Sequence, residues 1–161
     1  MTTKLMRNMS SAVIIISIGL FASGCSEFMK GHSVKQARFE HVAINVTDPV
    51  AMADWYSENL GMKIMLKSGT ARFVSDAGEN MMFELYNNSS APIPDYASQD
   101  KLVLHFAFSV DDINETCEKL VQAGAKWDQE ITSTDSGDKI AVLRDPWGVA
   151  IQFVKRAKPM L

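Results

Sequence analysis

The sequence predicts an α+β fold built from two tandem copies of one βαβββ module. The first observation is a repeat: "HVAINVTD" at 41–48 returns as "HFAFSVDD" at 105–112, an offset of 64 residues. The second is the order of patterns after each copy, which is a helical segment followed by three strand-like runs. A fixed internal period marks duplicated supersecondary units, so we expect two similar halves that pack together.

The first half shows the module most clearly. Residues 39–46, "FEHVAINV", alternate between apolar and polar positions, which predicts a strand. The next segment, "TDPVAMADWYSENLG", predicts a helix with Asp48 as N-cap, Pro49 in the first turn and Gly61 just past the end. Strand-like runs follow at 62–66, 71–75 and 81–86, and "DAGEN" (76–80) is the predicted turn between the last two.

The second half repeats this order after a polar linker at 87–100. We expect a strand at 102–110, "LVLHFAFSV", and then a helix capped by Asp111 or Asp112 and ended by Gly124. The remaining strands are predicted at 126–132, 139–144 and 149–154, with "DPWG" (145–148) as the tight turn before the last.

The N-terminus has the layout of a secretory signal peptide. Lys4 and Arg7 precede an uncharged apolar run at 12–22, which is shorter than the ~20 residues that a membrane-spanning helix needs. The following "ASGC" resembles the bacterial lipobox, in which the signal peptide is cut before a cysteine that is then acylated. We therefore expect a signal peptide at 1–24 and lipidation of Cys25; a plain secretory peptide is the alternative.

These patterns predict the domain boundaries and the location. A tether is expected at 25–37, the folded domain at 38–157 and a C-terminal tail at 158–161. Within the domain we expect module one at 38–87, a linker at 88–101 and module two at 102–157. A lipidated N-terminus would hold the protein at the cell envelope. Because serine follows Cys25, the resemblance indicates the periplasmic face of the outer membrane in a Gram-negative host.

Charge and cysteine content narrow the function classes. The net charge is −3 and becomes −5 once Lys4 and Arg7 are removed with the signal peptide, so the basic surface of a nucleic-acid-binding protein is not expected. After lipidation of Cys25 only Cys117 remains, so no disulfide can form within the chain. Cys117 lies in a predicted helix and is interpreted as a buried packing residue.

The repeat also selects four candidate site residues. His41 and His105 open the first strand of each half, and Glu84 and Gln152 occupy matching positions on the last strand, each between apolar neighbours. If the two halves pack around a pseudo-twofold axis, these side chains can converge. Two imidazoles, a carboxylate and an amide oxygen suit a divalent metal ion such as Zn, Ni, Fe, Co or Mn. Simple solvation of the strand histidines is the alternative.

Residues 39–155 resemble the vicinal oxygen chelate superfamily, which includes glyoxalase I, fosfomycin and bleomycin resistance proteins and extradiol dioxygenases. The resemblance rests on "HVAINVTDPVAMADWYSENLGMKI", on "DPWGVAIQFV" and on the paired modules. It implies a half-barrel cup of eight strands, a homodimer and a small-molecule ligand. It also implies metal binding by His41, Glu84, His105 and Gln152.

Gln152 is a departure from the family pattern, because metal enzymes of this superfamily generally have glutamate there. It disfavours dioxygenase and fosfomycin-type transferase activity. A glyoxalase-like lyase or isomerase acting on adjacent oxygens remains, and Glu84 is then the only one of the four that can serve as catalytic base, since an amide is not a base. Metal-free binding or sequestration of a small molecule, and a non-catalytic envelope lipoprotein, are the alternatives.

Three further aromatic residues lie in predicted helices or turns outside the set of four. Trp55 and Tyr56 lie on the first predicted helix and are interpreted as packing residues between helix and sheet. Trp147 sits at the predicted turn before the last strand, where it is a candidate for ligand or interface contact.

Overall fold

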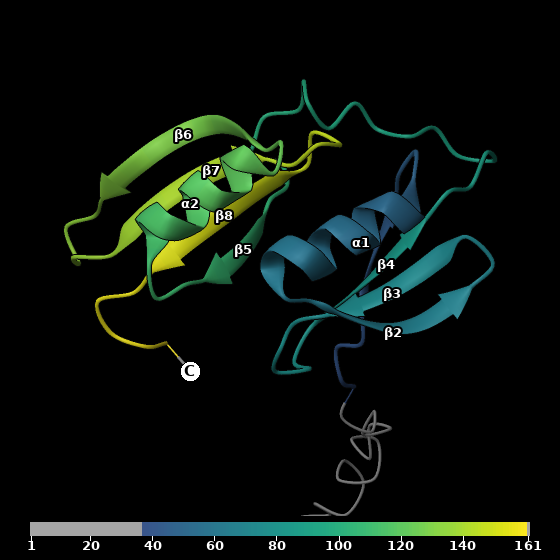
Figure 1. The fold of residues 1–161 in the computed structure, drawn as a ribbon, viewed down its shortest axis with the longest axis horizontal. Helices are drawn as coiled ribbons and strands as arrows, with labels where there is room; N and C mark the ends of the chain where they lie inside the picture. The colour runs from purple at the N-terminus through teal and green to yellow at the C-terminus, as the bar shows by residue number, and fades with distance from the viewer. Residues whose placement is uncertain (1–36, 161) are drawn as a thin grey trace, which may run out of the picture. The chain divides into compact units, whose positions relative to one another are not determined.

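The computed structural model describes residues 37–160, in which the chain runs through two similar halves (Figure 1). The first half contains β1 (Val42–Asn45), α1 (Pro49–Leu60), β2 (Lys63–Ser68), β3 (Ala71–Ser75) and β4 (Met82–Tyr86). The second half contains β5 (Phe106–Ser109), α2 (Ile113–Gln122), β6 (Lys126–Ser133), β7 (Lys139–Arg144) and β8 (Ala150–Lys155). Each half therefore runs strand, helix, strand, strand, strand.

The two halves also share one sheet topology. The first sheet has the order β1-β4-β3-β2 and the second β5-β8-β7-β6. In each, the first strand is parallel to the last, and the other pairs are antiparallel. The α+β fold of two βαβββ modules predicted from the repeat is confirmed.

The helix boundaries follow from the residues at their ends. The Asp48 side chain accepts a hydrogen bond from the Ala51 amide at 3.0 Å, and Gly61 ends α1 in the left-handed conformation with φ of 66°. Asp112, rather than Asp111, caps α2: its carboxylate accepts from the amides of the second and third helical residues at 2.9 and 3.0 Å. These bonds satisfy amides that have no partner within the helix.

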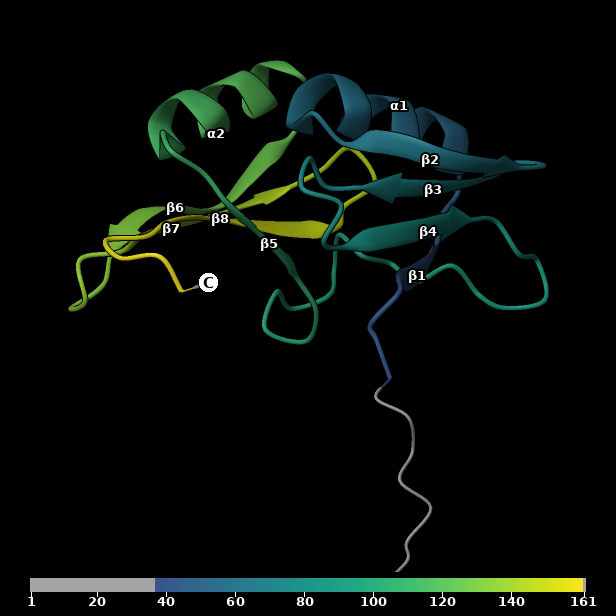
Figure 2. The same cartoon turned by 90° about the horizontal axis from the view of Figure 1, so that it is seen from below.

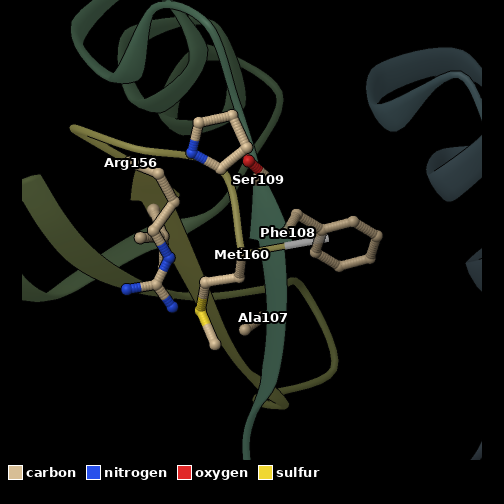
Figure 3. Close-up of a pocket in the computed structure, with 7 residues that line it drawn as sticks. Ala107, Phe108, Ser109, Arg156 and Met160 are labelled. Carbon is tan, nitrogen blue, oxygen red and sulfur yellow. The ribbon is translucent and has the colours of Figure 1, made fainter. Parts of the chain in front are cut away.

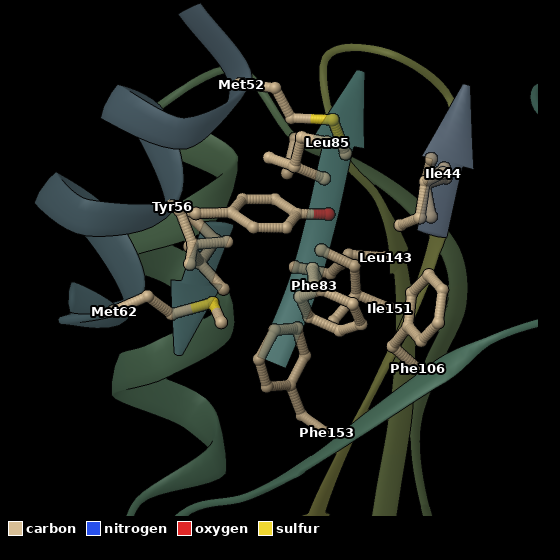
Figure 4. Packing of buried hydrophobic residues seen from close by; sticks show 14 of the residues in the cluster. Ile44, Met52, Tyr56, Met62, Phe83, Leu85, Phe106, Leu143, Ile151 and Phe153 are labelled. Atoms are coloured by element: carbon tan, nitrogen blue, oxygen red, sulfur yellow. The ribbon is translucent and has the colours of Figure 1, made fainter. Parts of the chain in front are cut away.

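Both helices cover the same side of the sheets, as Figure 2 shows, and the core lies beneath them. Tyr56 of α1 is fully buried there, among residues of both halves (Figure 4). The rings of Phe83 in β4 and Phe106 in β5 are 4.5 Å apart, which joins the two halves directly. Cys117 is also buried, and burial raises the pKa of its thiol to about 11, as expected of a packing residue.

The strand predicted at 102–110 is shorter than expected. β5 begins only at Phe106, and the residues before it form a turn. The carboxylate and carbonyl of Asp100 accept hydrogen bonds from the amides of Leu102 and Val103 at 2.8 and 3.0 Å. These bonds bend the chain away from the extended form. Leu102 and Val103 are consequently 82% and 71% exposed, so their apolar character did not indicate a strand.

The predicted signal peptide, the lipidation site Cys25 and all but the last residue of the tether lie outside the described residues. Within residues 37–160, no helix is both long and apolar enough to span a bilayer.

Candidate functional site

The strand register places the four predicted site residues at equivalent points of the two sheets. In the first sheet Ala43 of β1 pairs with Glu84 of β4, and in the second Ala107 of β5 pairs with Gln152 of β8. His41 and His105 precede β1 and β5 by one residue each. Because side chains alternate along a strand, Glu84 and Gln152 both point away from the helix-covered face on which Phe83, Ile151 and Phe153 are buried.

The structure brings His41 and Glu84 together. The Nε2 atom of His41 lies 3.3 Å from Oε2 of Glu84, and the two side chains are 29% and 28% exposed. The other ring nitrogen, Nδ1, lies 2.8 Å from Oε2 of Glu40. The imidazole is thus held between two carboxylates and still reaches solvent. We call His41 and Glu84 the first half-site.

An aromatic ring forms a wall of this half-site. Phe73 of β3 pairs in register with Glu84, so the two side chains share a sheet face. The rings of His41 and Phe73 meet edge to face, with centroids 5.7 Å apart and an interplanar angle of 89°. The first half-site therefore combines a hydrogen-bonding pair with an apolar surface, as ligand sites commonly do.

His105 is oriented differently. Its Nδ1 atom lies 2.8 Å from the carbonyl oxygen of Lys101. A carbonyl only accepts, so Nδ1 carries the proton in this bond and Nε2 of the neutral ring keeps its lone pair. A backbone carbonyl on the second nitrogen is also the arrangement that orients metal-binding histidines. His105 and Gln152 are both half-buried, and within residues 37–160 no hydrogen bond joins them; we call these two positions the second half-site.

The two half-sites do not combine into a metal centre. Among residues 37–160, no group of three or more His, Cys, Asp or Glu side chains is placed to hold a metal ion. The 3.3 Å between His41 and Glu84 does suit two neighbouring ligands of a tetrahedral ion, because metal–ligand bonds of about 2.0–2.2 Å place two ligands at roughly that separation. Within residues 37–160 the structure thus brings together two suitable ligands, His41 and Glu84.

Trp147 is placed between the two halves. Its indole is partly buried against the core, with the ring 6.5 Å from that of Trp55 in α1. The Trp55 Nε1 group donates to the carbonyl of Ala123 at the end of α2, at 2.8 Å. Trp55, predicted to pack between helix and sheet, therefore also packs the first half on the second, together with Trp147.

Arg144 and Asp145, at the end of β7, were not among the predicted site residues. Arg144 donates to the carbonyls of Tyr96, Gly148 and Gln99 and so holds the linker against β7. Asp145 is 3% exposed and accepts from the Tyr56 hydroxyl at 2.8 Å. Burial raises the pKa of the Asp145 carboxyl to about 6, although its hydrogen bonds act in the opposite direction. In the sequence, Asp145 is distinguished only as the first residue of the predicted "DPWG" turn.

Comparison with known proteins agrees with this architecture. The chain is 29% identical over 127 residues to the uncharacterized protein YwbC of Bacillus subtilis, covering 74% of this chain and 98% of that one. A glyoxalase family protein from Bacillus cereus superposes with a TM-score of 0.66 at 17% identity, covering 76% of this chain and 96% of the other. An antibiotic binding protein, TnmS3 of a Streptomyces strain, gives a TM-score of 0.60 at 19% identity, with coverages of 78% and 100%.

A glyoxalase I mutant from Zea mays is 27% identical, with a TM-score of 0.61, and the match covers 75% of this chain and 46% of the maize protein. The family model described as the Glyoxalase/Bleomycin resistance protein/Dioxygenase superfamily matches residues 38–153, which is most of the chain. The protein is therefore a member of the Glyoxalase/Bleomycin resistance protein/Dioxygenase superfamily.

Proposed function

We propose that this protein binds a small organic molecule at the first half-site without a metal-dependent reaction. The observation that carries the proposal is the His41–Glu84 pair, at 3.3 Å and half-buried on the sheet face opposite the helices. Phe73 supplies an apolar contact beside it. A similar fold in an antibiotic binding protein supports small-molecule binding as a use of this architecture.

The polar groups of the two half-sites fit the binding of a small molecule better than its catalytic conversion. Both nitrogens of His41 face carboxylates, so the ring orients Glu84, and the part-exposed Glu84 carboxylate is the group that can accept a hydrogen bond from a ligand. In the second half-site an amide, Gln152, stands where the repeat has Glu84, so the second half supplies no matching carboxylate. A ligand that carries hydroxyl or carbonyl groups on an aromatic body would use both the polar pair and Phe73.

Isothermal titration calorimetry tests this proposal. The chain without residues 1–25 is titrated with a panel of aromatic antibiotics that begins with bleomycin. We expect at least one binder whose affinity falls about tenfold, or about 1.4 kcal/mol, in His41→Ala and in Glu84→Gln. Glu58→Gln is the control, since Glu58 is exposed on α1. The proposal is wrong if no compound binds, or if both variants bind as the wild type does.

A metal-dependent lyase or isomerase is the second candidate. It is favoured by the tautomer that the Lys101 carbonyl imposes on His105, and by the ligand-like spacing of His41 and Glu84. A homodimer would bring a second copy of each half-site and so the missing ligands. A bound divalent ion would supply Lewis-acid polarisation of a substrate oxygen. Glu84 would then be the residue that accepts a proton.

Mass-spectrometric metal quantification separates the two candidates. One metal per chain in the wild type that is lost in His41→Ala and in His105→Ala would favour the lyase. Substoichiometric metal that is the same in wild type and both variants would exclude it. Gln152→Glu is the third arm: an increase in metal affinity would show that the four residues form one site in the assembled protein.

We further propose that the protein is exported and acylated at Cys25, which places the binding domain at the envelope. The support is the order of positive charge, apolar run, small residues and cysteine in residues 1–25. Mass spectrometry of the mature N-terminus tests it. A Cys25→Ser variant is expected to leave the membrane fraction, and an unmodified N-terminus in the wild type would overturn the proposal.

A further inference from the structure

A cavity lies on the second sheet, away from the first half-site. It has a volume of about 290 Å³ and is lined by residues of β5, of β8 and of the chain after β8, namely Ala107, Phe108, Ser109, Val154, Arg156, Pro159 and Met160. Figure 3 shows Arg156 and Met160 beside Ala107 of β5, while the Phe108 ring points away from them. We call it the C-terminal pocket.

The segment that forms one wall of this pocket is fixed to the domain. Asp138, at the turn before β7, accepts from the Arg156 guanidinium at 2.6 Å and from the Ala157 amide at 2.8 Å. These two bonds hold the pKa of the Asp138 carboxyl below its ordinary value, the amide of Ala157 contributing most. The chain after β8 is thus anchored twice, which keeps Pro159 and Met160 beside β5.

The lining is apolar except for two groups. The Ser109 hydroxyl makes no hydrogen bond to any of residues 37–160. Arg156 has five N–H donors, and the only bond recorded for them in that range is the one to Asp138. The guanidinium edge that is not bonded to Asp138 can therefore meet a ligand, while Val154, Pro159 and Met160 contact its apolar part.

We propose that the C-terminal pocket binds a small aromatic or aliphatic carboxylate, with the carboxylate on Arg156 and Ser109. A guanidinium binds a carboxylate or a phosphate through two parallel hydrogen bonds, and the apolar lining favours the carboxylate of an organic molecule. The volume would hold about ten water molecules, since each occupies about 30 Å³. A single-ring carboxylate such as benzoate therefore fits within it.

This site is independent of the proposed function. The first half-site is on the sheet of β1 to β4, whereas the C-terminal pocket uses β5, β8 and the chain after them. Ala107 lines the pocket and pairs in register with Gln152, so the pocket borders the second half-site. Its ligand would reach that half-site without contacting His41 or Glu84.

Titration followed by amide chemical shifts in NMR tests the proposal, with benzoate as the probe and benzyl alcohol as its uncharged counterpart. Benzoate is expected to shift the amides of Ala107, Ser109 and Met160, and benzyl alcohol to bind about tenfold more weakly. Arg156→Gln is expected to weaken benzoate binding by a similar factor. Lys158→Gln is the matched control, because it removes the same charge from the same segment outside the pocket.

Arg156→Gln also removes the bond to Asp138 that anchors the chain after β8. A second variant therefore tests the pocket with this bond intact. Ala107→Leu adds volume at an exposed position of β5 and is expected to block benzoate. Equal binding by Arg156→Gln and Lys158→Gln, or unchanged binding by Ala107→Leu, would overturn the proposal. Shifts confined to residues around His41 and Glu84 would also overturn it, while leaving the proposed function intact.

Discussion

The hydroxyl of Tyr56 donates a hydrogen bond to the carboxylate of Asp145 at 2.8 Å, and both side chains are buried. Tyr56 belongs to α1 in the first half, and Asp145 follows β7 in the second. The same carboxylate accepts from the amides of Trp147 and Val149 at 2.9 and 2.8 Å, which shapes the turn before β8. One side chain therefore shapes a local turn and binds the other half of the molecule.

The Asp145 carboxyl is expected to make stability depend on pH. Its pKa is raised from 3.8 to about 6 in the folded protein, so folding favours the protonated form. The resulting stabilisation is full below about pH 4 and is lost as the pH rises through about 6. A shift of this size is on the order of 3 kcal/mol. Urea unfolding of wild type and Asp145→Asn between pH 4 and 7 measures the difference.

Asp145→Asn is the informative comparison because its amide oxygen can still accept from Trp147 and Val149, while its NH₂ group faces the Tyr56 hydroxyl. Other carboxyls, such as Asp128 and Asp138, have lowered pKa values and act in the opposite direction with pH. The free energy of unfolding of the wild type should therefore fall relative to the variant as pH rises. A constant difference across this range would contradict the assignment.

Tyr56→Phe should destabilise the fold by about 1–3 kcal/mol, the usual cost of leaving a buried polar group without its partner. It should also raise the pKa of Asp145 further, because the Tyr56 bond lowers that pKa. Tyr86→Phe is the control, since no bond of the Tyr86 hydroxyl is recorded within residues 37–160. Denaturant midpoints at pH 7 check the result, and equal midpoints for the two variants would show that the bond does not stabilise the protein.

Gly148→Ala should be far more damaging than Gly61→Ala. Both glycines have positive φ, 86° and 66°, which costs a side chain about 1 kcal/mol. At Gly148 an added Cβ would also lie 2.7 Å from the amide nitrogen of Ala97 in the linker, whereas nothing lies within 4 Å at Gly61. Thermal unfolding of both variants is the measurement; a similar loss in melting temperature would mean that the linker moves freely away from the turn.

Trp55→Phe should cost about 1 kcal/mol or more, since it removes the bond from Nε1 to the Ala123 carbonyl and part of the contact with Trp147. Trp127→Phe is the matched control, because Trp127 is 42% exposed and lies on β6. Urea denaturation compares the two. A Trp127 variant as unstable as the Trp55 variant would argue against a special role for the contact between the halves.

The architecture could be predicted from the sequence for two reasons. The repeat is visible when residues 41–48 are compared with 105–112, and the helix caps depend on neighbouring residues. Asp48 and Asp112 begin their helices through bonds to amides two or three positions away, and Gly61 ends α1 through its backbone conformation, so adjacent sequence predicts them. The prediction that a strand begins at Leu102 was wrong, because local hydrogen bonds fix a turn there. Hydrophobicity is only an average tendency, and the bonds of Asp100 to two amides override it at that point.

The site was harder to predict because its geometry depends on distant parts of the chain. The repeat predicted that His41, Glu84, His105 and Gln152 converge; the structure places His41 3.3 Å from Glu84, through the parallel pairing of β1 with β4. The repeat also treats His105 as the twin of His41, but the Lys101 carbonyl gives its ring a different partner. Tyr56 and Asp145 are 89 residues apart, and no spacing in the sequence relates them.

No backbone ladder joins the two sheets, since β1 to β4 pair only among themselves and so do β5 to β8. The halves are held by side chains such as Tyr56 and Asp145 instead. A substitution on the exposed face of one sheet therefore leaves the strand register of the other unchanged. After duplication of an ancestral module, each copy could diverge on its own, so one half can retain a carboxylate at Glu84 while the other carries an amide at Gln152.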